Sequence, residues 1–157
     1  MCSINLITKV EEIMTSNLIL VKPNETVLHI DHLFKTNNIH HIPVVTDSKE
    51  FLGLISKVDV EMLKHWGTNF GLAEAQKQNK GILNSMLAKD VMKKGIVSVR
   101  KDNTLNYCAE LFGHNHFHCL PVIEDERIVG IVTTYDMIDF AFCQKKCVKI
   151  RNLQKEI

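Results

Sequence analysis

Two short stretches of the sequence carry the same side chains that can bind a ligand. They read GLISKVD over residues 53–59 and GIVTTYD over residues 130–136. In each, a glycine and two large aliphatic residues precede a hydroxyl residue, and an aspartate follows three positions later. A hydroxyl at a helix start lies where backbone amides and the helix dipole favour a phosphate, and an outward carboxylate can bind the hydroxyls of a sugar. The residues that suggest this chemistry are Ser56, Asp59, Thr133 and Asp136.

The same pattern also has a purely structural interpretation. In each copy a short buried strand would lead into a helix, with Ser56 or Thr133 as the N-cap. The aspartate would then return to free backbone N–H groups as in a capping box, which contributes about 1 kcal/mol. A single Ser-x-x-Asp is typical of such a cap, whereas the recurrence of the whole stretch favours ligand binding.

The elements that position these motifs follow a β-α-β-β-α order. After a helical turn at 10–14, the apolar pattern predicts a strand at 18–21, a helix at 25–38, strands at 39–45 and 51–55, and a second helix from Ser56. The proline of the second strand, Pro43, has no N–H to donate and is expected at a sheet edge or a strand start.

The order then repeats. An offset of 78 aligns Met14 with Met92, His40 with His118 and Pro43 with Pro121, and an offset of 77 aligns the two glycine-to-aspartate motifs. We therefore predict an α/β (α+β) fold of two repeats that pack together with pseudo-twofold symmetry, because a unit of about 50 residues buries too little surface alone. The predicted boundaries are 8–65 for the first repeat, 66–88 for a connector, 89–146 for the second repeat and 147–157 for a tail.

Glycines punctuate the predicted connector. Gly67, Gly71 and Gly81 divide it into two short helix-like pieces.

Composition narrows the class of protein. The chain has 157 residues, 45% of them hydrophobic, and a net charge of +1, which provides no broad basic field for nucleic acid. It has no signal-peptide pattern and no apolar run of membrane-spanning length, so we expect a cytoplasmic protein without a membrane partner. An odd number of cysteines without a CxxC pair indicates reduced thiols, mostly buried. They are Cys2, Cys108, Cys119, Cys143 and Cys147.

The chain resembles a tandem pair of cystathionine-β-synthase (CBS) domains, a Bateman module, over about residues 8–143. The resemblance rests on VEEIMT and AKDVMK, on HHIPVV and HCLPVI, and on the two motifs that end in aspartate. It implies binding of adenosine nucleotides such as AMP, ADP or ATP, with S-adenosylmethionine as a further candidate, in clefts between the repeats. It also implies a homodimer that associates through the second helix of each repeat.

The resemblance assigns parts of the ligand to residues. The aspartates would hold ribose, the hydroxyl residues would lie beside ribose or phosphate, and His40 and His118 would face phosphate. Backbone near the prolines and the residues just after Met14 and Met92 would border adenine. The implied ligand-binding set is Ser56, Asp59, Thr133, Asp136, His40, His41, Ile42, Pro43, His118, Cys119, Leu120, Pro121, Thr15 and Ser16.

One position departs from the family pattern. Where the γ subunit of AMP-activated kinase often has arginine, this chain has His41 and Cys119, which bring little or no charge near pH 7. Polyphosphate binding at the second site would then depend on another cation. The candidates are Lys57, Lys93, Lys94 and Arg100.

Two classes of function remain. The first is a regulatory sensor that binds an adenine nucleotide and signals to a separate effector protein, and the second is a dimerisation or interaction scaffold with empty clefts; both retained aspartates favour the sensor. We expect no enzyme and no catalytic cofactor, because a nucleophile elbow, a P-loop and HExxH are missing. We also expect no metal site, since His114-x-His116-x-His118 would share one side only in a strand and His114 should end a helix.

Overall fold

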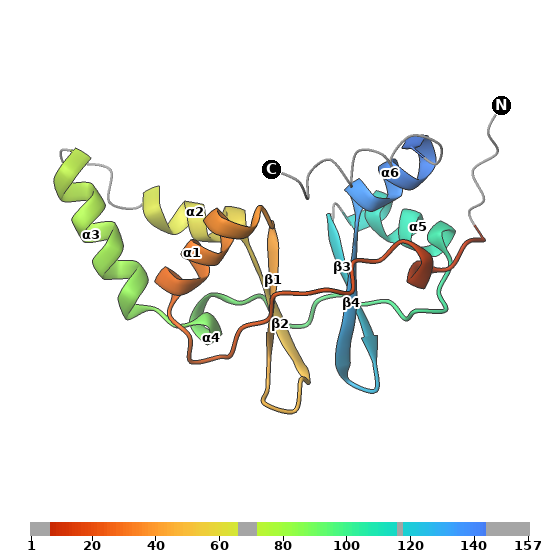
Figure 1. Cartoon of the computed structure of the whole chain (residues 1–157), viewed down its shortest axis with the longest axis horizontal. Helices are drawn as coiled ribbons and strands as arrows, with labels where there is room; N and C mark the ends of the chain where they lie inside the picture. Colours follow the sequence, from red (N-terminus) through yellow and green to blue (C-terminus); the bar gives the residue numbers. More distant parts are fainter. Residues whose placement is uncertain (1–6, 66–71, 116–117, 144–157) are drawn as a thin grey trace, which may run out of the picture. The chain divides into compact units, whose positions relative to one another are not determined.

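The computed structural model describes residues 7–65, 72–115 and 118–143. Two small antiparallel hairpins, each accompanied by helices, follow one another along the chain (Figure 1). The elements are a 3₁₀ turn at Val10–Glu12, then α1 (Val27–Asn37), β1 (His41–Val45), β2 (Phe51–Ser56), α2 (Lys57–His65), α3 (Leu72–Ser85), α4 (Ala88–Val91), α5 (Leu105–Asn115), β3 (Cys119–Glu124), β4 (Arg127–Thr133) and α6 (Thr134–Cys143). The predicted mixed α/β class is confirmed.

The chain forms two compact units, and neither is simply one sequence repeat. Among the described residues, the β1–β2 unit contains 17–65, 72–96 and 125–128, and the β3–β4 unit contains 7–16, 97–115, 118–124 and 129–143. The first buries a core that includes Ile30, Phe34 and Ile55, and the second a core that includes Leu105, Leu120 and Val132.

Each unit takes the leading segment of the other repeat. Val10, which opens the first repeat, is fully buried in the β3–β4 unit, and its amide donates to the carbonyl of Asn103 at 2.9 Å. The equivalent residue of the second repeat, Ala88, is fully buried in the β1–β2 unit, and its amide donates to the carbonyl of Glu25 at 2.8 Å. The leading segments are therefore exchanged; in Figure 1 the dark red segment runs beside α5.

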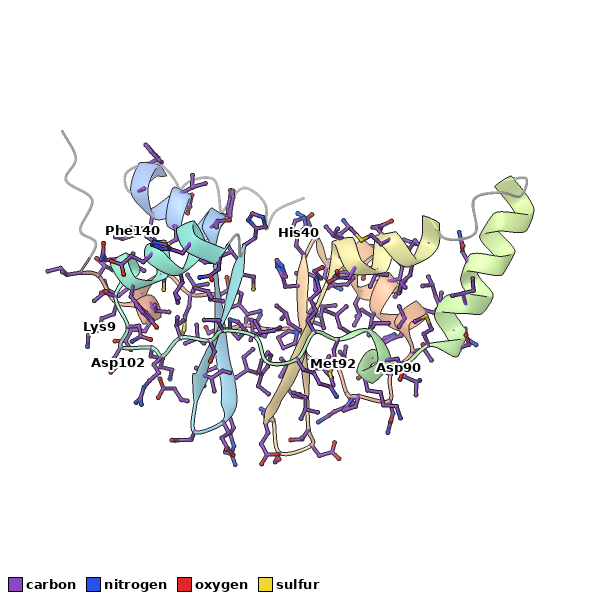
Figure 2. All side chains as sticks on the ribbon, turned by 180° about the vertical axis from the view of Figure 1, so that it is seen from behind. Lys9, His40, Asp90, Met92, Asp102 and Phe140 are labelled. Carbon is purple, nitrogen blue, oxygen red and sulfur yellow. The ribbon has the colours of Figure 1, made fainter. Side chains whose placement is uncertain are left out.

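The repeated glycines make room for these exchanged segments. A Cβ on Gly53 would lie 2.5 Å from the backbone oxygen of Lys93, and a Cβ on Gly130 would lie 2.6 Å from Sδ of Met14. Figure 2 shows Met92 against the β1–β2 hairpin, as this geometry requires. The glycine in each motif thus serves close packing of the arriving chain.

The first predicted strand of each repeat is reduced to one residue. Residues 18–21 do not form an extended strand; only Val21 pairs, in parallel, with Val44, and in the second repeat Val99 pairs likewise with Val122. The Val21 amide donates to the carbonyl of Pro43 at 3.1 Å, on the side of β1 away from β2. The N–H that proline lacks is therefore not needed in the β1–β2 ladder, although Val21 bonds to β1 on its other side.

The prediction that glycines divide the connector into short helical pieces was wrong at Gly81. Residues 66–71 lie outside the described part, but α3 continues through Gly81, which was predicted to interrupt it. A glycine weakens an exposed helix by only about 1 kcal/mol. Here α3 packs against α1 and α2, so tertiary contacts outweigh local propensity.

A cluster of charges links α1 to α2. Asp31 on α1, whose side chain is 6% exposed, forms ion pairs with Lys64 of α2 and with Lys35 one turn further along α1. Lys64 also pairs with Glu61 at 2.9 Å. Burial raises the pKa of Asp31, but hydrogen bonds from the two lysines and their charges more than offset this, so the pKa lies below its ordinary value.

Two further expectations concern cysteines and membranes. Cys108 and Cys119 are free thiols and buried, as predicted, whereas Cys2, Cys147 and the side chain of Cys143 lie outside the described part. Burial raises the pKa of Cys108 to about 11, so it remains a protonated, apolar side chain. No helix among the described residues has the length and apolar character to cross a membrane.

Candidate functional site

Both predicted capping motifs form at the starts of α2 and α6. The Asp59 amide donates to Oγ of Ser56, and the Asp136 amide to Oγ1 of Thr133, each at 3.2 Å. In return, each hydroxyl donates to Oδ2 of its aspartate, and the Thr133 amide donates to the same oxygen of Asp136 at 2.8 Å. The structural interpretation of the motif is therefore correct at both helices, and each aspartate keeps Oδ1 for another partner.

Several helix amides that were expected to face a phosphate already have partners. The Lys57 amide, the first of α2, donates to the carbonyl of His40 at 2.8 Å, and the Thr134 amide of α6 donates to the carbonyl of His118 at 3.2 Å. With the Asp59 and Asp136 amides also occupied, few donors remain for an anion at either helix start. Phosphate recognition would have to come mainly from side chains.

At α2 the remaining aspartate oxygen faces a lysine. Lys93 Nζ lies 2.8 Å from Oδ1 of Asp59, and the Lys93 backbone is anchored by hydrogen bonds in both directions with Leu54, at 2.9 and 3.0 Å. Burial raises the pKa of Asp59, but hydrogen bonds from Lys93 and Ser56 and the lysine charge more than offset this and hold the pKa below its ordinary value. We call Ser56, Asp59 and Lys93 the Asp59 site.

At α6 the equivalent place is occupied by a threonine. Thr15 exchanges two hydrogen bonds of 2.9 Å with Ile131, as Lys93 does with Leu54. Within the described ranges no side chain donates to Oδ1 of Asp136 and no cation pairs with it. We call Thr15, Thr133 and Asp136 the Asp136 site.

The pKa of the Cys119 thiol depends on burial and on the negative charge of Asp136. Burial, followed by the negative charge of Asp136, raises the pKa of Cys119 to about 12. The thiol therefore stays protonated near neutral pH and neither attacks nor binds as a thiolate.

The other predicted ligand residues divide into exposed side chains and core side chains. His40 and His118 are exposed at the ends of the hairpins where α2 and α6 begin, and Figure 2 shows His40 there. His41 is half-buried, and Ser16, next to Thr15, is exposed. The side chains that are buried, and can offer a ligand little beyond backbone atoms, are Ile42, Pro43, Cys119, Leu120 and Pro121.

Of the four candidate cations, only Lys93 is placed at a predicted site residue by an ion pair. It lies at the Asp59 site rather than at the second site, where a compensating cation was expected. Arg100 pairs with Asp102 at 3.5 Å and Glu124 at 3.7 Å, and Lys57 and Lys94 form no ion pair with another described residue. The sequence did indicate that Lys93 belongs to a site, because the offset of 78 aligns Lys93 with Thr15, a predicted ligand-binding residue.

The histidine cluster does not assemble a centre in the described ranges. His114 lies in the last turn of α5, as expected, and His116 lies outside the described residues. Among the residues described, no group of three or more His, Cys, Asp or Glu side chains is placed to hold a metal ion.

The comparisons with known proteins agree with this architecture. The CBS domain family model matches residues 10–62 and 88–142, so the chain belongs to the CBS domain family and carries two copies of the domain. One curated relative is inosine-5'-monophosphate dehydrogenase of Methanocaldococcus jannaschii, 28% identical over 133 residues that cover 84% of this chain and 23% of that enzyme. The chain spans between 23% and 46% of the length of the first curated relatives that it matches.

Solved structures with this fold include complexes with adenosyl ligands. CBSX2, a protein of Arabidopsis thaliana solved in complex with AMP, has a TM-score of 0.72 and 24% identity, with 88% of this chain and 99% of that chain covered. The CBS domain pair of protein MJ0100, in complex with 5'-methylthioadenosine and S-adenosyl-L-methionine, has a TM-score of 0.68 and 24% identity, with 88% and 99% covered. At this identity the likeness establishes the fold alone.

Proposed function

We propose that this CBS domain pair is a regulatory module that binds adenosyl ligands through Asp59 and Asp136 and passes the signal to a separate effector protein. One observation carries the proposal: both repeats present a hydroxyl and a carboxylate at the start of the second helix, with Oδ1 left over from the cap. A ribose that donates its two hydroxyls to such a carboxylate would be held by charge-assisted hydrogen bonds.

The energies are adequate for a sensor. A dissociation constant of tens of micromolar corresponds to about 6 kcal/mol. A few charge-assisted hydrogen bonds of about 1.5–3 kcal/mol each, less the costs of association, reach that value. No covalent step is required, and the relatives named as enzymes are much longer than this chain.

Ligand-induced stabilisation tests the proposal. Thermal unfolding of the whole chain is followed with AMP, ADP, ATP, 5'-methylthioadenosine and S-adenosylmethionine, because a ligand at 100 times its Kd stabilises the folded state by about 2.7 kcal/mol. We expect a concentration-dependent rise in Tm with at least one of these. If all five leave the Tm unchanged, the module is a scaffold rather than a sensor.

Variants at the carboxylates assign the binding to residues. Asp59→Asn and Asp136→Asn retain the shape of the cap but remove the charge, and each should weaken binding at one site by about tenfold or more. Asp90→Asn is the matched control, because Asp90 also caps a helix start, with a 3.0 Å hydrogen bond from the Leu87 amide, outside both sites. Equal affinities in all three variants would rule out the assignment.

The proposed partner in addition to the effector is a second copy of the chain. Helices α2 and α6 each pack one face on a core and leave large apolar side chains 57% to 81% exposed on the other. These exposed residues are Val58, Met62, Tyr135, Ile138 and Phe142. Apolar side chains at helical spacing are suited to packing against a like helix, as in a homodimer.

The oligomeric state tests this part of the proposal. Ile138→Glu places a charge within the exposed apolar face of α6, and light scattering after gel filtration should report a shift from dimer to monomer. Tyr107→Glu, at an exposed apolar residue of α5, is the control and should leave the mass unchanged. A wild-type chain that is monomeric at tens of micromolar would exclude the homodimer.

The proposed location is the cytoplasm. Adenylates and a reducing environment occur together there, and both thiols described by the structure, Cys108 and Cys119, are free.

A further inference from the structure

Lys93 and Thr15 occupy the same place in the two sites. Each is anchored by a pair of backbone hydrogen bonds to the second strand of a hairpin, Lys93 to Leu54 and Thr15 to Ile131. Each follows a methionine that contacts the glycine of that strand, Met92 at Gly53 and Met14 at Gly130. The backbone therefore delivers either side chain to the start of a helix, and the side chains differ by one positive charge.

The Lys93–Asp59 pair can be exchanged for another partner. The Lys93 side chain is 67% exposed and that of Asp59 is 22% exposed, so water screens the pair and its hold on the lysine is weak. A ribose that donates to Oδ1 of Asp59 competes with the ammonium group. A ligand that also carries a phosphate offers the displaced ammonium group a new anionic partner, whereas a neutral ligand offers none.

The Asp136 site has the opposite charge: a carboxylate without a lysine beside it among the described residues. Its carboxylate is not paired with a cation in the described part of the chain, and its charge acts on the buried thiol of Cys119. An anionic group that approaches Asp136 would be repelled, whereas a neutral or cationic group would not.

We propose that the residue at this place selects the ligand by charge, so that Lys93 makes the Asp59 site select adenosyl ligands with a phosphate, while Thr15 leaves the Asp136 site to neutral or cationic ones. The inference rests on the proposed function and names the ligand class of each site. Residues 93 and 15 act on selectivity, whereas the carboxylates provide the common ribose contact.

Exchanging the two residues tests the inference. Calorimetric titration gives the Kd for AMP and for adenosine in the Asp136→Asn background, which reports on the Asp59 site, with Lys93 or Lys93→Thr. In the Asp59→Asn background the same pair of ligands is titrated with Thr15 or Thr15→Lys. We expect Lys93→Thr to lower the AMP-over-adenosine preference by about tenfold and Thr15→Lys to raise it by about tenfold, the effect of one charge-assisted hydrogen bond.

Lys94→Thr is the matched control, because it removes the same charge from the next, exposed residue and should leave the preference unchanged. An equal effect of Lys94→Thr and Lys93→Thr would mean a general field and would overturn the inference, as would a preference that neither exchange alters. These results leave the proposed function standing. If the wild-type chain binds neither AMP nor adenosine nor S-adenosylmethionine, the proposed function fails and this inference with it.

Discussion

The two repeats share a backbone and differ in their charges. Leading segments, glycine contacts and helix caps correspond residue by residue between the two units. The charged groups do not: Lys93 faces Asp59 where Thr15 stands near Asp136, and the Asp31–Lys64 pair of the first repeat corresponds to Ala109 and Ala141 in the second. Hydrogen bonding and packing thus fix the backbone that the two repeats share. The repeats differ in their charged side chains.

The Asp31 cluster should give the largest difference between the repeats. Asp31→Ala leaves Lys64, whose side chain is 16% exposed, without its main partner, and should lower the free energy of unfolding by about 3 kcal/mol. The double variant Asp31→Ala, Lys64→Ala reproduces these two positions of the second repeat and should recover about half of that loss, because it also removes the lysine charge that would be left with Glu61 alone. Urea unfolding of the three proteins measures both values.

An exposed pair provides the control. Lys9 and Glu11 lie 3.9 Å apart with half-exposed side chains, and Glu11→Ala should change the free energy of unfolding by less than about 0.5 kcal/mol. If the double variant were as unstable as Asp31→Ala alone, the loss would reflect missing packing rather than the charge of a lysine left with Glu61 alone.

The two motif glycines should respond unequally to the same substitution. In Gly53→Ala the new Cβ meets a backbone oxygen, that of Lys93, whereas in Gly130→Ala it meets the flexible end of Met14. We expect a loss of about 2–3 kcal/mol for the first and about 1 kcal/mol for the second, since only the methionine can move away. Thermal unfolding compares them, and equal losses would mean that Met14 is as constrained as the backbone. Gly81→Ala, which meets no atom within 4 Å, is the steric control; because it replaces a glycine inside α3, we expect it to raise the free energy of unfolding by about 1 kcal/mol.

The smallest expected effect is on the loss of stability at acid pH, to which the Lys93–Asp59 pair contributes. Asp59 has a lower pKa in the folded chain than its ordinary value of 3.8, so its stabilising effect is complete above that pH and is lost as the pH falls through the folded value. Lys93→Thr removes one cause of the shift and should reduce the loss of stability between pH 6 and pH 3 by about 0.5 kcal/mol, given the exposure of the lysine. Urea midpoints at both pH values measure it; an identical pH dependence in Lys93→Thr and wild type would indicate that Ser56 alone sets the pKa.

Local patterns predicted most of the helices and hairpins. The helix predicted at 25–38 forms as α1: Thr26 caps it with a hydrogen bond from the His29 amide, and Asn38 ends it in the left-handed region with φ of 48°. The motif hydroxyls cap α2 and α6 because Ser-x-x-Asp and Thr-x-x-Asp satisfy free amides with local groups only. Such features depend on neighbours in the chain, which the sequence displays directly.

The features that escaped prediction depend on distant partners. Residues 18–21 have the apolar run of a strand, but only Val21 finds a neighbouring strand to bond, and this depends on where β1 lies. The contact between Lys93 and Asp59 joins residues 34 positions apart and exists only because the leading segment of one repeat packs in the other unit. Sequence alone predicted the carboxylate and named the lysine, but it could not connect them.

The exchanged leading segments have a consequence for biosynthesis. During translation the first hairpin emerges from the ribosome well before residues 86–93, whose backbone groups bond to Val27, Glu25 and Leu54. Residues 8–15, made first, must wait until Leu105 and Ile131 have been synthesised before their own bonds can close. The exchanged bonds of the β1–β2 unit can therefore close only after residue 93 has emerged, and those of the β3–β4 unit only after residue 131, so we expect neither repeat to fold alone on the ribosome.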